Sequence, residues 1–408
     1  MGLKLIDTSI LRRKIEVVIN RMLRPHPKAS YFLFGPRQTG KSTFLQATYP
    51  AKETLAFNLL ETTDYLRILA DPSLLREAVQ SRPPEIKYVL IDEIQRVPLL
   101  LNEVHLLLES PRPPLFIMTG SSARRLRRGD TNWLGGRAVT YHMFPFVSDE
   151  LGQLFSLNKA LQVGTLPAMY LQDDIVLVQQ KFRSYVDTYL REEIEKEARI
   201  RNLGAFVRFI NIAAEENGRE LNYSKMGRDC GISYQTIKDY FQLLEDTLLG
   251  FFLYPLTKTT RKRMAKHPKF YFFDTGVLRA LQNKISVPLQ PKTIEYGHAF
   301  EHFLILEIYR KAKTFQADFV FGYYRNERDV EVDLTIQCPS GALLAIEIKS
   351  TAFPAKNDLY GLKTFKQDHP KAKLCLACTS SRSSLVDDIP ILPWQNLWDW
   401  ILESAAKP

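Results

Sequence analysis

Cysteine is scarce in this chain, which has four cysteines in 408 residues. So few thiols cannot build the disulfide framework of a small secreted domain, and they suit the reducing cytoplasm. Cys375 and Cys378 form a C-x-x-C within KLCLACTS, but no second pair follows in the sequence and no βαβ redox pattern surrounds them. We therefore interpret both as small apolar residues of a buried strand.

Long hydrophobic runs are lacking too. The longest strongly apolar stretch, LLGFFLYPL, is far shorter than the roughly 20 residues that a membrane-spanning helix needs. The first residues, MGLKLIDTSILRRKIEV, carry charges throughout and have no unbroken apolar core of a secretory signal. We therefore expect a cytoplasmic protein without a membrane partner.

Positive charge, by contrast, is in excess. The chain has 55 lysines and arginines against 45 acidic residues, a formal charge of +10. This balance favours an anionic partner such as nucleic acid, although mild basicity alone is weak evidence. The length leaves room for two or three domains.

The stretch YFLFGPRQTGKSTF contains the pattern G-x-x-x-x-G-K-[ST] between Gly35 and Ser42. In such a loop the backbone N–H groups surround nucleotide phosphates, the lysine reaches the β- and γ-phosphates, and the serine holds Mg²⁺. The apolar run before it predicts a buried strand, and KSTFLQATY predicts a helix whose N-terminus faces the phosphates. We expect ATP and Mg²⁺ as cofactors. The expected binding residues are Gly35, Pro36, Arg37, Gln38, Thr39, Gly40, Lys41, Ser42 and Thr43.

Further strand-like runs alternate with helical or polar segments, which predicts a parallel sheet with crossover helices. These runs are TLAFNLL, KYVLID, PLFIMTGS and RAVTYHMFP. In YVLIDEIQRVP the apolar strand ends in Asp92 and Glu93, at the edge where parallel sheets bind ligands. We expect Asp92 to hold Mg²⁺ beside Ser42, and Glu93 to activate the attacking water as general base.

The next strand is followed by residues that suit phosphate chemistry. Ser121, or its neighbour Ser122, would sense the γ-phosphate. An arginine finger would come from the arginines of SSARRLRRG or from Arg137 in LGGRA. We favour Arg137, because two glycines allow the backbone to approach a neighbouring subunit, and we expect a homo-oligomer. The other arginines fit a solvated helical face equally well.

These motifs resemble those of the AAA+ ATPases of bacteria and archaea that carry a C-terminal domain of unknown function. The resemblance rests on GPRQTGKST, IDEIQRVP, TGSSAR, LGGRA and FPFVSDEL, and it continues through YVDTYLREEI, YFFDTGVLRAL, GHAFEHFLILEIYR and EVDLTI…AIEIKS. It implies an α/β fold with a P-loop AAA+ parallel sheet, helices on both its faces, and a C-terminal restriction-endonuclease-like α/β domain. We expect domains at residues 1–150, 151–285 and 286–408.

The middle of the chain predicts a winged helix. GAFVRFINIAAEENGRE, YSKMGRD and YQTIKDYFQLLEDTLL form three helices, and the link CGIS supplies a glycine turn with Ser233 as N-cap. The strand candidates GFFLYPL and KFYFFDTG then flank the basic segment TKTTRKRMAKHP, as in a wing. The expected DNA contacts are Tyr234, Gln235 and Lys238 on the recognition helix and Arg261, Lys262 and Arg263 on the wing. The alternative is a winged helix that serves only as an ATPase lid or an oligomer contact.

In the last third, VEVDLTI and ALLAIEIKS flank the turn QCPSG. A hairpin centred on Ser340 places Asp333 opposite Glu347, and Glu331 opposite Lys349. Because opposed carboxylates repel unless a cation lies between them, this spacing suggests a metal site, and it resembles the PD-(D/E)xK nuclease core.

That resemblance implies that Asp333 and Glu347 bind Mg²⁺, that Lys349 positions water, and that Glu301 on the preceding helix is a further ligand. A surface ladder of opposite charges and a catalytically inactive scaffold are the alternatives. HAFEH also matches the zinc-protease pattern H-x-x-E-H, but no other protease feature accompanies it.

The sequence thus predicts an ATP-hydrolysing AAA+ enzyme that acts on DNA through a winged helix and a nuclease-like domain. The alternative is a nucleotide-gated signalling switch whose C-terminal domain binds a protein partner.

Overall fold

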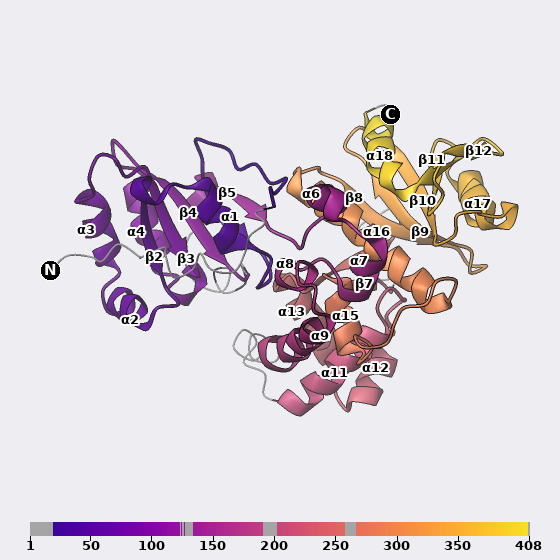
Figure 1. Ribbon diagram of the computed structural model, residues 1–408, viewed down its shortest axis with the longest axis horizontal. Coiled ribbons are helices and arrows are strands. Elements are labelled where there is room, and N and C mark those ends of the chain that lie inside the picture. The colour runs from indigo at the N-terminus through magenta and orange to yellow at the C-terminus, as the bar shows by residue number, and fades with distance from the viewer. Residues whose placement is uncertain are drawn as a thin grey trace.

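The computed structural model describes residues 19–122, 124, 126, 134–190, 202–257 and 267–406. These residues form an N-terminal lobe, a middle region that is mainly helical, and a C-terminal region built on a sheet. Figure 1 shows the N-terminal lobe at the left and the other two regions at the right, with the C-terminal sheet above the middle helices. The expected wing contacts Arg261, Lys262 and Arg263 lie outside the described residues.

The N-terminal lobe contains the expected parallel sheet, whose five strands are arranged in the order β2-β3-β4-β1-β5. The strands are β1 (Ser30–Phe34), β2 (Thr54–Asn58), β3 (Tyr88–Asp92), β4 (Leu115–Gly120) and β5 (Ala138–His142). The helices are α1 (Lys41–Thr48), α2 (Thr62–Ala70), α3 (Ser73–Gln80) and α4 (Leu100–Leu108). Because all five strands are parallel, their carboxyl ends share one edge of the sheet.

Both faces of this sheet are buried. Phe32 and Phe34 of β1 pack in one cluster with residues of α3 and α4, including Leu75. On the other face, Tyr31 packs with Leu45 of α1. Burial on both faces explains why the strands read as nearly continuous apolar runs in the sequence.

The middle region begins with short helices and continues with three longer ones. The first group comprises α6 (Ser148–Leu151), α7 (Leu157–Val163), α8 (Pro167–Tyr170), α9 (Ile175–Ser184) and a π-helical segment (Tyr185–Leu190). The second comprises α11 (Leu203–Glu215), α12 (Tyr223–Cys230) and α13 (Tyr234–Asp246). Gly231 ends α12 with a φ of 70°, and Ser233 caps α13 by accepting a hydrogen bond from the Thr236 N–H at 3.1 Å. The predicted glycine turn after α12 and the predicted Ser233 cap of α13 are therefore confirmed.

The C-terminal region contains an eight-stranded sheet in the order β12-β13-β11-β10-β9-β8-β6-β7. Its strands are β6 (Gly250–Pro255), β7 (Lys269–Phe272), β8 (Val320–Arg325), β9 (Glu331–Gln337), β10 (Leu343–Lys349), β11 (Lys373–Cys378), β12 (Ser384–Val386) and β13 (Ile389–Pro393). The two strands expected for the wing, β6 and β7, pair with each other, and β6 also pairs with β8. The sheet therefore contains strands from both sides of the expected domain boundary at residue 285. The boundary itself stays a prediction.

Helices cover both faces of the C-terminal sheet. They are α15 (Thr275–Leu281), α16 (Ile294–Thr314), α17 (Tyr360–Asp368) and α18 (Leu397–Ala405). Phe300 of α16 belongs to one core cluster with Ile346 of β10, and Phe365 of α17 to another cluster with Ala345. Among the described residues, no helix combines the length and apolarity needed to cross a membrane.

A buried arginine joins α16 to the two other regions. Arg310 donates to the carbonyl oxygens of Phe146 at 3.0 Å and Phe273 at 2.6 Å, and to the Thr165 hydroxyl at 2.7 Å. Its guanidinium also lies 3.7 Å from the buried carboxylate of Asp274. These contacts fix the end of the N-terminal lobe against the core of the C-terminal region.

Candidate nucleotide site and acidic cluster

The loop between β1 and α1 has the backbone that a phosphate-binding turn requires. Gln38 and Gly40 have φ values of 65° and 92°, so two of its residues are left-handed. A Cβ on Gly35 would lie 2.2 Å from the carbonyl oxygen of Met143, so no larger residue fits there. Helix α1 then begins at Lys41 with no acidic residue in its first turn, which leaves its N-terminus suited to an anion.

Lys41 lies within the curve of this loop. Its ammonium donates to the carbonyl oxygens of Gly35 at 2.6 Å and Pro36 at 3.1 Å, and the residue is 9% exposed. The buried Thr39 hydroxyl also donates to Pro36, at 2.9 Å, while Ser42 is exposed on the first turn of α1. The residues present therefore fit Mg²⁺-ATP: a narrow glycine cradle, a cation inside it and a hydroxyl at its rim.

The two acids after β3 are held by neighbours from the next strand and turn. The Thr119 hydroxyl donates to the Asp92 carboxylate, and the Glu93 N–H approaches the same hydroxyl at 3.4 Å. Glu93 is 8% exposed, and its carboxylate accepts a hydrogen bond from the side-chain amide of Gln95. Gln95 also donates to the Ser121 hydroxyl at 3.2 Å. Asp92, Glu93 and Ser121 therefore belong to one hydrogen-bonded group at the carboxyl edge.

Sequence reasoning missed Thr119 and Gln95, which link these residues. Gly120 accommodates the Gln95 side chain, but this role is clear only from the structure. A Cβ on Gly120 would lie 2.3 Å from the Gln95 amide oxygen, so the glycine of MTGSS makes space for the glutamine of DEIQ. Without the structure, nothing in the sequence shows that these two segments meet.

Two residues from outside the P-loop brace it. Arg21 donates to the carbonyl oxygens of Thr39 at 3.2 Å and Phe144 at 2.5 Å, and its guanidinium pairs with Glu150 at 3.1 Å. From the middle region, the Tyr185 hydroxyl donates to the carbonyl oxygen of Arg37 at 3.4 Å. The P-loop therefore contacts the middle region directly.

Arg137, the expected arginine finger, precedes the amino end of β5. Its guanidinium pairs with Glu109 at 2.9 Å, and its side chain is 42% exposed. A strand of five residues separates it by about 16 Å from the edge that carries the P-loop. It is therefore too distant to act on its own nucleotide, and a role toward a neighbouring subunit stays a prediction.

The first turns of α13 place the expected DNA contacts on an exposed face. Tyr234 is 53% exposed, and the Lys238 ammonium lies 5.1 Å from the centre of its ring and 5.5 Å from that of Tyr223. Gln235 donates to the carboxylate of Asp239 at 3.1 Å. This face thus presents a cation between two aromatic rings, with an acid beside it.

The acidic residues of the C-terminal hairpin converge as expected. Strands β9 and β10 pair in the register centred on Ser340, from Leu343 opposite Gln337 to Ile346 opposite Leu334. Asp333 and Glu347 come next along the two strands. The Asp333 carboxylate accepts the Ile348 N–H at 2.8 Å, and the Lys349 ammonium donates to Glu347 at 2.5 Å.

The acids of this hairpin shift one another's pKa values. Burial and the charge of Glu301 raise the pKa of Asp333 to about 7. Burial and the charge of Asp333 raise the pKa of Glu347 to about 8, although the Lys349 ammonium opposes both shifts. Glu347 is 7% exposed, and its Oε2 has no hydrogen-bond partner among the described residues. The electrostatic coupling requires that Glu301, Asp333 and Glu347 lie near one another.

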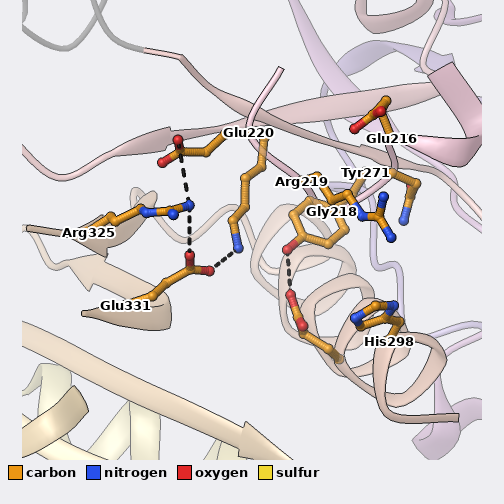
Figure 2. A pocket seen from close by; sticks show the side chains of 11 residues that line it. Glu216, Gly218, Arg219, Glu220, Tyr271, His298, Arg325 and Glu331 are labelled. Carbon is orange, nitrogen blue, oxygen red and sulfur yellow. Dashed lines mark hydrogen bonds and ion pairs between the residues drawn. The ribbon is translucent and has the colours of Figure 1, made fainter. Parts of the chain in front are cut away.

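The surface ladder between Glu331 and Lys349 does not form. Glu331 pairs instead with Lys269 of β7, and its other oxygen lies 3.7 Å from the Arg325 guanidinium. These residues line a cavity of about 410 Å³ between the middle and C-terminal regions. Figure 2 shows this cavity, with Glu331 and Arg325 on one side and His298 of helix α16 on the other. Glu301 also lines it.

The described residues include no group of three or more His, Cys, Asp or Glu side chains arranged to hold a metal ion. In HAFEH, the Nε2 of His302 is hydrogen-bonded to the carbonyl oxygen of Phe272 at 2.6 Å. Burial lowers the pKa of His302 to about 4, so its ring is neutral and Nε2 carries the donated hydrogen. Cys375 and Cys378 are buried free thiols. The metal-binding roles expected for Asp333 and Glu347 stay predictions.

Three family models match separate parts of the chain. Residues 27–152 match a model described as AAA domain, residues 154–287 a domain of unknown function (DUF8612), and residues 296–397 another domain of unknown function (DUF4143). Together with the parallel sheet, the first match supports an AAA-type ATPase domain with a P-loop fold, followed at the C-terminal end by DUF4143.

Similar proteins add little about activity. The chain is 25% identical over 356 residues to uncharacterized proteins of Mycobacterium tuberculosis and Mycobacterium bovis, a match that covers 85% of this chain and 75% of each relative. Among solved structures, one titled "Structure of Drosophila ORC bound to AT-rich DNA and Cdc6" aligns with 63% of this chain and 86% of that chain. Its sequence identity is 10% and the TM-score is 0.20, a level that establishes no common fold.

Proposed function

We propose that this protein hydrolyses ATP with Mg²⁺ and acts on DNA through the exposed face of α13, the basic segment between β6 and β7, and the C-terminal domain. The observation that carries the ATPase part is the group formed by Asp92, Thr119, Glu93 and Gln95 beside the P-loop. In this proposal Asp92 holds the metal together with Ser42, and it is supported by the second acid, Glu93, which is largely buried and accepts a hydrogen bond from Gln95.

Each residue of this site has a defined task. Bound Mg²⁺-ATP supplies the phosphoryl group that is transferred to water. Lys41, which now contacts the Gly35 and Pro36 carbonyls, would bind phosphate oxygens, and Ser42 and Asp92 would hold the metal ion. Glu93 accepts a proton from the water, and the Gln95 amide holds the Glu93 carboxylate in place.

The DNA part of the proposal rests on α13 and on charge. Lys238 and Tyr234 are exposed near the start of the last helix of a helix-turn-helix arrangement, where side chains reach base edges and phosphates. The formal net charge of +10 favours binding to a polyanion. The acidic cluster of the C-terminal domain then serves as a nuclease-like scaffold. We propose that this scaffold contacts DNA, and the proposal does not include cleavage.

The second candidate function is a nucleotide-gated switch that binds a protein partner. It is favoured by one observation: β6 and β7 are built into the C-terminal sheet, so the middle and C-terminal regions are joined as one body. The Tyr185–Arg37 contact connects that body to the P-loop. A change at the nucleotide would therefore be transmitted to the C-terminal surface.

ATP hydrolysis with and without DNA separates these functions. We expect single-stranded, duplex or branched DNA to stimulate phosphate release by the wild-type chain, with Lys41→Ala as the inactive reference. Hydrolysis that no form of DNA changes would contradict the DNA proposal and favour the switch.

A further inference from the structure

The acidic cluster of the C-terminal domain receives side chains from β7, a strand of the same sheet that precedes this domain in the sequence. Lys269 and Tyr271 are two residues apart on β7, so their side chains point to the same side of that strand. Both line the cavity of Figure 2. They are 4% and 1% exposed. The family models end one domain at residue 287 and begin the next at 296, so these two residues come from outside the acidic domain itself.

Lys269 is fixed as a buried cation among the acids. Its ammonium donates to Glu331 and lies 5.1 Å from the centre of the Tyr323 ring. Its backbone is held in the antiparallel ladder opposite Leu253 of β6. Burial lowers the pKa of Lys269, but the nearby carboxylates of Glu301, Glu331 and Asp333 more than offset this effect and raise it. Lys269 therefore stays charged.

One carboxylate oxygen of each acid in the cluster also accepts a hydrogen bond from another group of the protein. The Tyr271 hydroxyl donates to Glu301 at 2.7 Å. The Ile348 N–H donates to Asp333, and the Lys349 ammonium to Glu347. Dashed lines in Figure 2 mark the contacts of Glu331 and Tyr271. A divalent ion would have to bind through the oxygens that remain, such as the Glu347 Oε2, and it would be repelled by the ammonium groups of Lys269 and Lys349.

We infer that the Lys269 ammonium occupies the cation position of the acidic cluster, so that the site as folded does not accept a divalent metal. The restriction-endonuclease resemblance implies a metal at Asp333 and Glu347, and the arrangement of the residues present disagrees with it. Tyr271 is a positioning residue that holds Glu301 in this metal-free arrangement. The inference rests on the acidic scaffold of the proposed function, but not on ATP hydrolysis or on DNA.

The test is a Mn²⁺ titration of the full chain without nucleotide or DNA, in which free Mn²⁺ is read by electron paramagnetic resonance. The variants are Lys269→Met, Lys269→Arg, Asp333→Asn and the double variant Lys269→Met/Asp333→Asn. Wild type is expected to show no Mn²⁺ site that depends on Asp333. Removal of a buried positive charge should create such a site, with affinity at least about tenfold higher than in wild type. Lys269→Arg keeps the charge and should behave as wild type.

Two results would overturn the inference. One is micromolar Mn²⁺ binding to wild type that Asp333→Asn abolishes. The other is a Lys269→Met protein that melts cooperatively yet gains no site. Where Lys269→Met does not fold, the comparison of wild type with Asp333→Asn decides alone. Because neither ATP nor DNA is present, the outcome is independent of the proposed ATPase and DNA functions.

Discussion

The hydroxyl of Thr119, at the end of β4, donates a hydrogen bond to the carboxylate of Asp92, at the end of β3. The same oxygen lies 3.4 Å from the N–H of Glu93, so one side chain contacts both acids that follow β3. β4 lies beside both β3 and β1 in the sheet, which places Thr119 between the acids and the P-loop. Thr119 is therefore positioned to fix the expected metal ligand, Asp92, relative to the expected general base, Glu93.

Thr119→Val should lower the turnover of ATP by about tenfold or more while leaving ATP affinity within a few-fold of wild type. The substitution keeps the shape of the side chain but removes the donor to Asp92, so it perturbs a residue of the metal shell rather than the phosphate cradle. Phosphate release and the binding of a fluorescent ATP analogue measure the two effects. Thr140→Val, on the edge strand β5, is the matched control. Unchanged turnover would mean that the Thr119 contact has no role in hydrolysis.

Glu93→Gln should bind ATP and fail to hydrolyse it, whereas Lys41→Ala should abolish binding. Glutamine keeps an oxygen that can accept the hydrogen bond from Gln95, so the turn is retained while the proton acceptor is lost. Lys41 supplies the cation inside the loop, and alanine leaves the phosphate charge without it. Nucleotide binding and phosphate release distinguish the variants. Normal turnover by Glu93→Gln would show that another group is the general base.

Neutralisation of Arg261, Lys262 and Arg263 should weaken DNA binding and flatten its dependence on salt. Each phosphate contact that is lost reduces the slope of log affinity against log salt by about 0.9. Binding titrations at several salt concentrations measure both quantities. As a control with the same charge change, the exposed Lys28, Lys52 and Lys87 of the N-terminal lobe are replaced by glutamine. Equal affinity and slope in the wing variant would favour a role as lid or oligomer contact.

Local signals in the sequence predicted much of this structure. The P-loop, the strand that ends in Asp92 and the cap at Ser233 each depend on residues close together in the chain, where sterics and hydrogen bonds act directly. The hairpin register centred on Ser340 was predicted for the same reason, because a short turn between two alternating strands leaves few alternatives.

Contacts between distant segments were not predicted. β6 and β7 carry the pattern of a hairpin, but nothing in that pattern shows that β6 also pairs with β8. Glu331 was expected opposite Lys349, yet its partner is Lys269, 62 residues away. A buried lysine takes whichever carboxylates the packing of regions places around it, and that packing depends on the whole chain. Arg21 and Thr119 were missed for the same reason.

Burial lowers the pKa of His302 to about 4, and the charge of Arg310 adds to this shift. In the unfolded chain its pKa returns to about 6.5, so between these values the unfolded state binds more protons than the folded state. Stability should therefore fall as the pH decreases from about 6.5 toward 4, by on the order of 3 kcal/mol for this residue.

His302→Gln tests this pH dependence. Glutamine keeps a donor for the Phe272 carbonyl oxygen but has no proton to gain, so the loss of stability over this pH range should be smaller than in wild type. Urea unfolding of both proteins at pH 7, 6 and 5 gives the comparison. Other buried groups, including Asp274 and Glu307, titrate in both proteins, so the difference between the two curves isolates His302. Parallel curves would show that the His302 ring is already protonated in the folded protein, or that it stays neutral in both states.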